Sequence, residues 1–465
     1  MIKALFGIGR EAEKYYSFLD AIGETPKFAF DNSPKRQGTF FHDIEILPPS
    51  TLYECDCDIV ISCNFKEAIT EQLSEMGCSD RIVDLNTILR GAIEQYSEEF
   101  AVMAPVKSES KESIVIDAFD GIGWGGMEIW SYEVGRELAD RGYFVKIFGS
   151  LDQVHPDDEI EKMIIRRPLD RQDIFLTVEG IIHELEKLVP FVLIDNWTEY
   201  VLYAAFILKK KYPESIRIIS IQHNDVQSLY EKKMLWEDVF ERISGVSQRI
   251  NTNLANKYGV DVDKILYKEN FLTFNKEYTP RIRQAGKTII IGWGARLEYY
   301  QKRADLIVPF IESLERSGID YVFNIAGNGP MYDEINDYVN TRRMTGKVHV
   351  LGAISQQQMG DFWLKQDIYL NLSDFEGCSL AMLEAMSMGC VPVVTRVSGT
   401  DEFIIDKNTG FCADVGDVDA IVERIVYLYD HPEDWVILSE NAAKIVREKC
   451  RKSDYVDCLE KAINL

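Results

Sequence analysis

Two glutamates eight positions apart lie in the segment Asp374–Val394, which reads DFEGCSLAMLEAMSMGCVPVV. The pattern predicts a strand end, a turn near Gly377 and then a helix, with Glu376 before the helix and Glu384 about two turns into it. At a rise of about 1.5 Å per residue, the two side chains are on the order of 10 Å apart. That separation matches the span from a sugar ring across a diphosphate to a ribose, whose vicinal hydroxyls suit carboxylate acceptors.

The start of this predicted helix has the features of an anion site. Gly377 removes a side chain where a ligand must approach the backbone, and the free amides of Cys378, Ser379, Leu380 and Ala381 then point above the helix. Such amides and the helix dipole favour an anion. From spacing alone, a helix cap followed by one surface glutamate explains the segment equally well.

A short β-branched run followed by a glycine-bearing turn and an amphipathic helix begins three times in the chain. The starts are Lys3–Phe6, Ser113–Phe119 and Thr288–Ile291. This repeated order predicts an α/β fold with three parallel-sheet units. The second and third are expected to be full doubly wound domains whose facing strand ends form a cleft, where open α/β sheets bind ligands.

Composition shifts suggest the domain boundaries. We expect a small domain at residues 1–95, a polar linker at 96–112, and two larger domains at 113–280 and 281–465, with a final helix that could return to the domain before it. The predicted elements of the second unit are a helix at Met127–Arg141 and strands at Tyr143–Gly149, Phe191–Asn196 and Ile216–Gln222. Those of the third are strands at Tyr321–Ala326, Val348–Leu351, Ile368–Leu372 and Val391–Thr395.

Charge and composition exclude several classes of protein. The net charge of -25 over 465 residues argues against a nucleic-acid partner. No apolar run approaches the roughly 20 residues that span a bilayer, and no secretion signal is apparent, so we expect a cytoplasmic protein. The nine cysteines should be reduced, and the cluster Cys55, Cys57, Cys63 and Cys78 lacks the spacing of a metal site. We therefore expect no metal site at this cluster.

The glutamate segment resembles the E-x7-E region of the group 1 family of retaining glycosyltransferases, which have the two-domain GT-B fold. The likeness extends over IGWGARLEYYQKRADL, IAGNGPMYDEI, VHVLGAI and GCVPVVTRVSGTDEFI, between Ile291 and Ile404. The resemblance implies that Glu376 contacts donor sugar hydroxyls and that Glu384 contacts the ribose. It also implies that Arg296 and Lys302 bind the donor diphosphate, a sensible pair of a bidentate guanidinium and a point-charge ammonium.

The same resemblance extends to the domain before it. GIGWGGMEIW at Gly121–Trp130 is similar to the family's glycine-rich loop, with Gly125 and Gly126 as the positions near the donor phosphates. His223 matches the histidine that ends a strand near the sugar, although a lone histidine is often only a structural hydrogen-bonding group. The nucleobase is expected against the loop that contains Ile354. The family's fold implies no cofactor beyond the donor, no metal, and transfer with retention.

The amino-terminal unit departs from the family pattern. Gly7, Gly9 and Ala12 fit the GxGxx(G/A) pattern after a strand, and Asp31 follows the next strand at the spacing that contacts a ribose. The unit resembles small Rossmann-type domains found beside sugar-modifying acyltransferases, which bind nucleotide sugars. A scaffold or interaction module is the alternative.

The leading hypothesis is a glycosyltransferase that moves a hexose from a nucleoside diphosphate sugar, most simply a UDP-sugar, to a glycan, lipid-linked or protein acceptor in the synthesis of a cell-surface polysaccharide or glycoconjugate. The alternatives are a nucleotide-sugar epimerase or phosphorylase on the same fold, or a noncatalytic nucleotide-sugar-binding module. The basic segments Lys209–Lys211 and Arg166–Arg171 could contact an anionic membrane, or could be solvated helix faces. The sequence does not indicate an oligomeric state.

Overall fold

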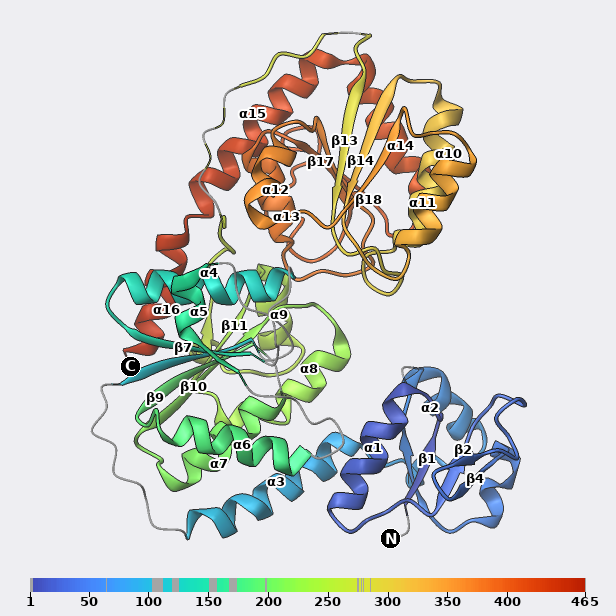
Figure 1. Ribbon diagram of the computed structural model, residues 1–465, viewed down its shortest axis with the longest axis vertical. Helices are drawn as coiled ribbons and strands as arrows, with labels where there is room; N and C mark the ends of the chain where they lie inside the picture. Colours follow the sequence, from blue (N-terminus) through green and yellow to red (C-terminus); the bar gives the residue numbers. More distant parts are fainter. Residues whose placement is uncertain are drawn as a thin grey trace.

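A computed structural model of the chain contains three α/β domains, drawn from blue to red in Figure 1. It describes residues 3–63, 65–102, 112–118, 125–149, 157–166, 174–196, 199–273, 276, 278, 280–284 and 286–464. The predicted glycine-rich loop is described only from Gly125 onward, and residues 103–111 of the predicted linker and 167–171 of one basic segment also lie outside these ranges.

The first domain is a five-stranded sheet in the order β3-β4-β2-β1-β5, parallel except for the pair β3 and β4. Its interior strand β1, between β2 and β5, is buried along its whole length, as expected for a strand covered on both faces. The elements are β1 (Lys3–Phe6), α1 (Arg10–Ala21), β2 (Phe28–Phe30), β3 (Phe40–Phe41), β4 (Ile44–Leu47), β5 (Asp58–Ile61), α2 (Lys66–Glu75) and α3 (Leu85–Ala101).

The middle domain is a parallel seven-stranded sheet in the order β12-β11-β10-β9-β6-β7-β8. Strands β6 and β9 at its centre are entirely buried because their apolar runs face helices on both sides. The elements are β6 (Ser113–Asp117), α4 (Gly126–Asp140), β7 (Phe144–Gly149), α5 (Asp158–Met163), β8 (Ile164–Arg166), α6 (Ile174–Glu186), β9 (Phe191–Asp195), α7 (Glu199–Lys211), β10 (Ile216–Gln222), α8 (Gln227–Met234), β11 (Arg242–Gly245), α9 (Gln248–Asn256) and β12 (Ile265–Leu266).

The third domain is a parallel six-stranded sheet in the order β15-β14-β13-β16-β17-β18. Its strands at Tyr321–Ala326 and Val391–Thr395 have the predicted bounds, as does Ile216–Gln222 in the middle domain. The elements are β13 (Ile289–Gly294), α10 (Ile307–Ser317), β14 (Tyr321–Ala326), α11 (Tyr332–Thr341), β15 (Val348–Gly352), α12 (Gln356–Trp363), β16 (Ile368–Asn371), α13 (Leu380–Ser387), β17 (Val391–Thr395), β18 (Phe411–Ala413), α14 (Val418–Asp430), α15 (Pro432–Lys449) and α16 (Lys452–Ile463).

Two helices join the domains. Helix α16 leaves the third domain along the end of α15 and packs on α4 of the middle domain, where Arg141 pairs with Asp457 and Glu460 at 2.6 and 2.8 Å (Figure 1). Helix α3 lies against α7, and its Arg90 stacks over the ring of Trp236 at 4.3 Å. This helix continues to residue 101, so the expectation of a linker from residue 96 is wrong for its first six residues.

Candidate functional site

The predicted site residues lie where the third sheet reverses direction. The chain runs from β13 outward to β15 and then returns to place β16 on the other side of β13. Ligands bind at such switch points because the loops that follow the two strands diverge there. Arg296 and Lys302 lie in the loop after β13, and Glu376 lies in the loop after β16.

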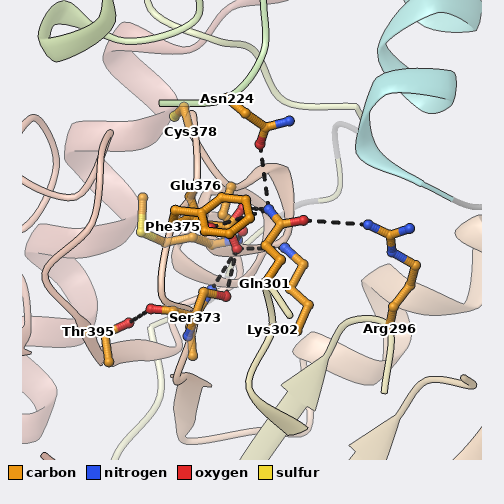
Figure 2. A network of polar contacts seen from close by, with 12 residues as sticks. Asn224, Arg296, Gln301, Lys302, Ser373, Phe375, Glu376, Cys378 and Thr395 are labelled. Atoms are coloured by element: carbon orange, nitrogen blue, oxygen red, sulfur yellow. Dashed lines mark hydrogen bonds and ion pairs between the residues drawn. The ribbon is translucent and has the colours of Figure 1, made fainter. Parts of the chain in front are cut away.

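The carboxylate of Glu376 is held by side chains from both loops (Figure 2). Lys302 Nζ lies 2.5 Å from Oε1, and Ser373 Oγ donates to the same oxygen at 2.8 Å. Asn371 Nδ2 adds a longer contact of 3.4 Å. Glu376 is only 5% exposed, so the lysine neutralises a buried charge that would otherwise be costly.

Arg296 is the exposed cation of the site. Among the residues that the structure describes, its hydrogen-bonding partner is Gln301, whose Oε1 accepts from Nη2 at 3.4 Å. A guanidinium held this weakly can turn to bind a phosphate with two parallel hydrogen bonds. The structure therefore brings Arg296, Lys302 and Glu376 into one network, which Gln301 completes (Figure 2).

Helix α13 begins at Leu380, later than predicted, because Ser379 is its N-cap and accepts a hydrogen bond from Met382 N at 3.3 Å. Glu384 is consequently about one turn into the helix instead of two.

Gly125 is the N-cap of α4, and a Cβ atom on Gly126 would lie 3.8 Å from Leu380 of the opposite domain. The two helix N-termini thus approach each other, and both favour an anion.

Glu384 is buried, with 4% exposure. Its Oε1 accepts hydrogen bonds from Thr273 Oγ1 and, at 2.9 Å, from Gln356 Nε2 at the start of α12. Ile354 lies just before that helix and packs partly buried against the core. Burial raises the pKa of Glu384 to about 7, although both hydrogen bonds oppose the shift.

His223 follows β10 and lies at the facing edge of the middle domain. The amide of Asn196 donates from Nδ2 to Asp117 O at 3.1 Å and to Ser131 Oγ at 2.9 Å, which leaves its Oδ1 as the acceptor for His223 Nε2 at 2.8 Å. This arrangement assigns the hydrogen to Nε2 and the lone pair to Nδ1. Burial, followed by the charge of Lys233, lowers the pKa of His223 to about 3, so the ring is neutral at physiological pH.

The middle and third domains touch directly along segments 223–225 and 375–377, which we call the interdomain seam. Asp225 N donates to Glu376 O at 3.2 Å across it. A Cβ atom on Gly377 would lie 1.9 Å from the carbonyl oxygen of His223, so only glycine permits this approach. The predicted sugar carboxylate and the predicted histidine are thereby neighbours from different domains.

The predicted ligand residues of the first domain are occupied by internal contacts. Asp31 accepts from Ile8 N at 2.8 Å and Ser33 N at 2.7 Å, and it pairs with Arg36 at 3.1 Å. A ribose would have to displace these partners. A Cβ atom on Gly7 would lie 2.7 Å from Cys63 Sγ, so this glycine serves close packing, whereas Gly9 has open space beside it.

Several polar residues of the site were missed by sequence reasoning. Gln301, Ser373 and Asn196 carry no motif of their own, and adjacency of Gln301 to Lys302 was the only signal for any of them. A further group is Lys233, which is fully buried and donates to Ser220 Oγ and Ile221 O at 2.7 Å each. Its burial lowers its pKa to about 8.

The basic residues Lys209–Lys211, predicted as a possible membrane contact, have partners within the protein. Lys209 pairs with Glu241, Lys211 pairs with Glu186 at 2.8 Å, and Lys210 lies over the ring of Phe206 at 5.3 Å. Within the described ranges, no helix combines the length and apolar character that crossing a bilayer requires.

Comparison with known proteins identifies the third domain. Residues 275–445 match the family of glycosyl transferases group 1. The N-acetyl-alpha-D-glucosaminyl L-malate synthase of Bacillus anthracis is 22% identical over 365 residues, which cover 72% of this chain and 93% of that protein. For other curated relatives, this chain spans less than half of their length.

Solved structures share the fold of the paired domains. Anabaena HepE in complex with UDP and glucose has a TM-score of 0.62 at 12% identity, covering 76% of this chain and 100% of its own. The pneumococcal O-GlcNAc transferase GtfA in complex with UDP and GlcNAc has a TM-score of 0.62 at 11% identity, covering 76% and 99%. The predicted α/β fold of the GT-B type is confirmed, and residues 275–445 of the third domain match the group 1 glycosyltransferase family.

Proposed function

We propose that this chain is a glycosyltransferase that moves a hexose from a UDP-sugar to a hydroxyl group of a glycan, lipid-linked or protein acceptor, with retention at the anomeric carbon. The observation that carries the proposal is the Lys302–Glu376 pair at the switch point of the third sheet, which faces His223 across the interdomain seam. UDP in two related folds supports the choice of nucleotide.

The ligand-free pair suggests how the donor is held. Lys302 and Glu376 neutralise each other at 2.5 Å, and a UDP-sugar offers each of them a better partner. Its phosphates would bind Lys302 and Arg296, and its sugar hydroxyls would donate hydrogen bonds to Glu376. The N-termini of α4 and α13 would add backbone amides to the same diphosphate without any metal.

The proposed reaction is a displacement on one face of the sugar. The bond between the anomeric carbon and the diphosphate oxygen breaks, and its electron pair leaves with UDP. The acceptor hydroxyl oxygen bonds to the anomeric carbon and passes its proton to the departing phosphate oxygen. Neutral His223 would orient a sugar hydroxyl through Nδ1, because Asn196 already occupies Nε2.

The test uses the full chain with UDP-glucose, UDP-galactose and UDP-GlcNAc and a panel of glycan and lipid acceptors. We expect the release of UDP to depend on the acceptor. We also expect NMR to show that the new glycosidic bond has the same axial or equatorial configuration as the bond in the donor. Glu376→Gln should abolish turnover while UDP alone still binds, because UDP lacks the sugar that this residue contacts.

The alternatives give different outcomes in the same experiment. An epimerase would release a free sugar without any acceptor, and a noncatalytic module would bind UDP-sugars without turnover. Failure of every UDP-sugar to bind would contradict the proposal as a whole.

A further inference from the structure

Gln301 lies between Glu376 and Arg296, which the proposed function assigns to the sugar and the diphosphate, and it also reaches the middle domain (Figure 2). Its Nε2 is 3.2 Å from Glu376 Oε2, 3.2 Å from Phe375 O and 3.5 Å from Asn224 Oδ1. Asn224 belongs to the middle domain, next to His223. The other end of the same amide, Oε1, accepts from Arg296 at 3.4 Å.

Hydrogen bonds fix the backbone around Gln301, and this restricts the direction in which its side chain points. The carboxylate of Glu298 accepts from the amides of Tyr300, Gln301 and Lys302 at 2.7, 3.0 and 2.7 Å. The carbonyl of Gln301 accepts from Asp374 N at 2.9 Å, which ties the loop after β13 to the loop after β16.

The amide nitrogen of Gln301 has more acceptors than hydrogens. Two N–H groups face three oxygens at 3.2 to 3.5 Å, so one of the three oxygens always lacks a full hydrogen bond from this amide. When a donor sugar hydroxyl occupies Glu376, that carboxylate no longer needs the Gln301 hydrogen. The released hydrogen can then strengthen the bond to Asn224 of the opposite domain.

We propose that Gln301 is a positioning residue that couples recognition of the donor sugar to closure of the two domains. The inference rests on the proposed function, because it needs a sugar that donates to Glu376. It makes a specific distinction. UDP alone binds Lys302 and Arg296 but brings no sugar hydroxyl to Glu376, so the Gln301 N–H stays on that carboxylate, whereas a UDP-sugar shifts this hydrogen bond toward Asn224.

The experiment is a double-mutant cycle on Gln301→Leu and Asn224→Ala, with Gln227→Leu as a matched control. Gln227 is an exposed glutamine of α8 whose side chain contacts Glu231 on its own helix. We measure kcat and KM for UDP-sugar turnover, the Kd of UDP, and the radius of gyration by small-angle scattering with UDP or with UDP-sugar.

Each single variant should lower kcat on the order of 3- to 10-fold, as expected for one lost hydrogen bond. The Kd of UDP should stay within about twofold for Asn224→Ala, and the control should match the wild type. The double variant should be no worse than Gln301→Leu alone, and the extra compaction that UDP-sugar causes over UDP in the wild type should be absent from both variants.

The coupling would be overturned if the losses in kcat of the two single variants multiplied in the double variant. It would also be overturned if UDP-sugar compacted Gln301→Leu as much as the wild type. Either result would leave the proposed function intact. A wild-type chain that neither binds UDP nor turns over UDP-sugars would remove both proposals. A merely structural role for Gln301 would lower the melting temperature without separating the responses to UDP and UDP-sugar.

Discussion

Substitution of Gly377 by alanine tests whether the close approach of the two domains is needed for activity. The new Cβ would lie 1.9 Å from the carbonyl oxygen of His223 and 2.8 Å from Val246 Cγ2. Ordinary contact begins near 3.4 Å, so the segments must separate by about 1.5 Å. Neither the carbonyl oxygen nor the opposing backbone can move aside alone, because Asp225 N also donates to Glu376 O.

A displacement of about 1 Å in reacting groups can cost on the order of 100-fold in rate, so Gly377→Ala should lower kcat by about 100-fold or more. The overlap must be relieved by parting two domains that share a core containing Val246 and Leu380. Overpacking of this kind costs about 1–3 kcal/mol, so the melting temperature should also fall, by roughly 2–12 °C in domains of this size. Turnover of UDP-sugar and thermal denaturation measure the two effects separately.

Gly180→Ala is the control for this prediction, because a Cβ at that position of α6 meets no atom within 4 Å. It should keep wild-type turnover and gain roughly 0.5–1 kcal/mol of stability as a helical glycine replaced by alanine. Turnover of Gly377→Ala within about threefold of the wild type would refute the reasoning that the seam must close to this distance.

Three further predictions concern charged groups. Ribose hydroxyls need an ionised acceptor, and the pKa of Glu384 is about 7. The affinity for UDP, measured by calorimetry, should therefore be about tenfold weaker at pH 6 than at pH 8. The Glu384→Gln variant should lack this pH dependence, and it corrects for the titration of UDP itself. Lys302→Ala strands the buried carboxylate of Glu376 and should cost about 3 kcal/mol in unfolding free energy, whereas the double variant Lys302→Ala/Glu376→Gln should recover most of that stability but no activity. Asp31→Asn weakens contacts within the first domain and should cost about 1–3 kcal/mol by denaturant titration, while an altered Kd for UDP would contradict its internal role.

Prediction from sequence succeeded where the signal is local. The strands at Ile216–Gln222 and Val391–Thr395 are apolar runs bounded by turn residues, and the structure gives them the predicted ends. The polar SEE at 97–99 concealed the continuation of α3, although Tyr96 and Phe100 in the same stretch pack against the core. Ser379 shifted the start of α13 because a side-chain cap outweighs the turn tendency of the glycine before it.

The candidate site was predictable to the extent that charge and spacing are written along the chain. Arg296, Lys302 and Glu376 do meet, because the loops after β13 and β16 flank one switch point. The amides of Gln301 and Asn196 could not be foreseen. Gln301 contacts Glu376, 75 positions away, and Asn196 is anchored on the carbonyl of Asp117, 79 positions away. Only the strand order brings these partners within hydrogen-bonding distance.

The first domain shows why a glycine pattern after a strand is insufficient evidence for a ligand. Its sheet reverses between β1 and β5, as the other two reverse between β6 and β9 and between β13 and β16. At this reversal, however, Gly7 packs on Cys63 and the carboxylate of Asp31 is already shared among internal donors. In the third domain, by contrast, the reversal presents Arg296, Lys302 and Glu376 next to the interdomain seam. Because α1 instead reaches the middle domain through Lys14, which pairs with Glu199 at 3.0 Å, the contacts favour a scaffold over a second nucleotide site.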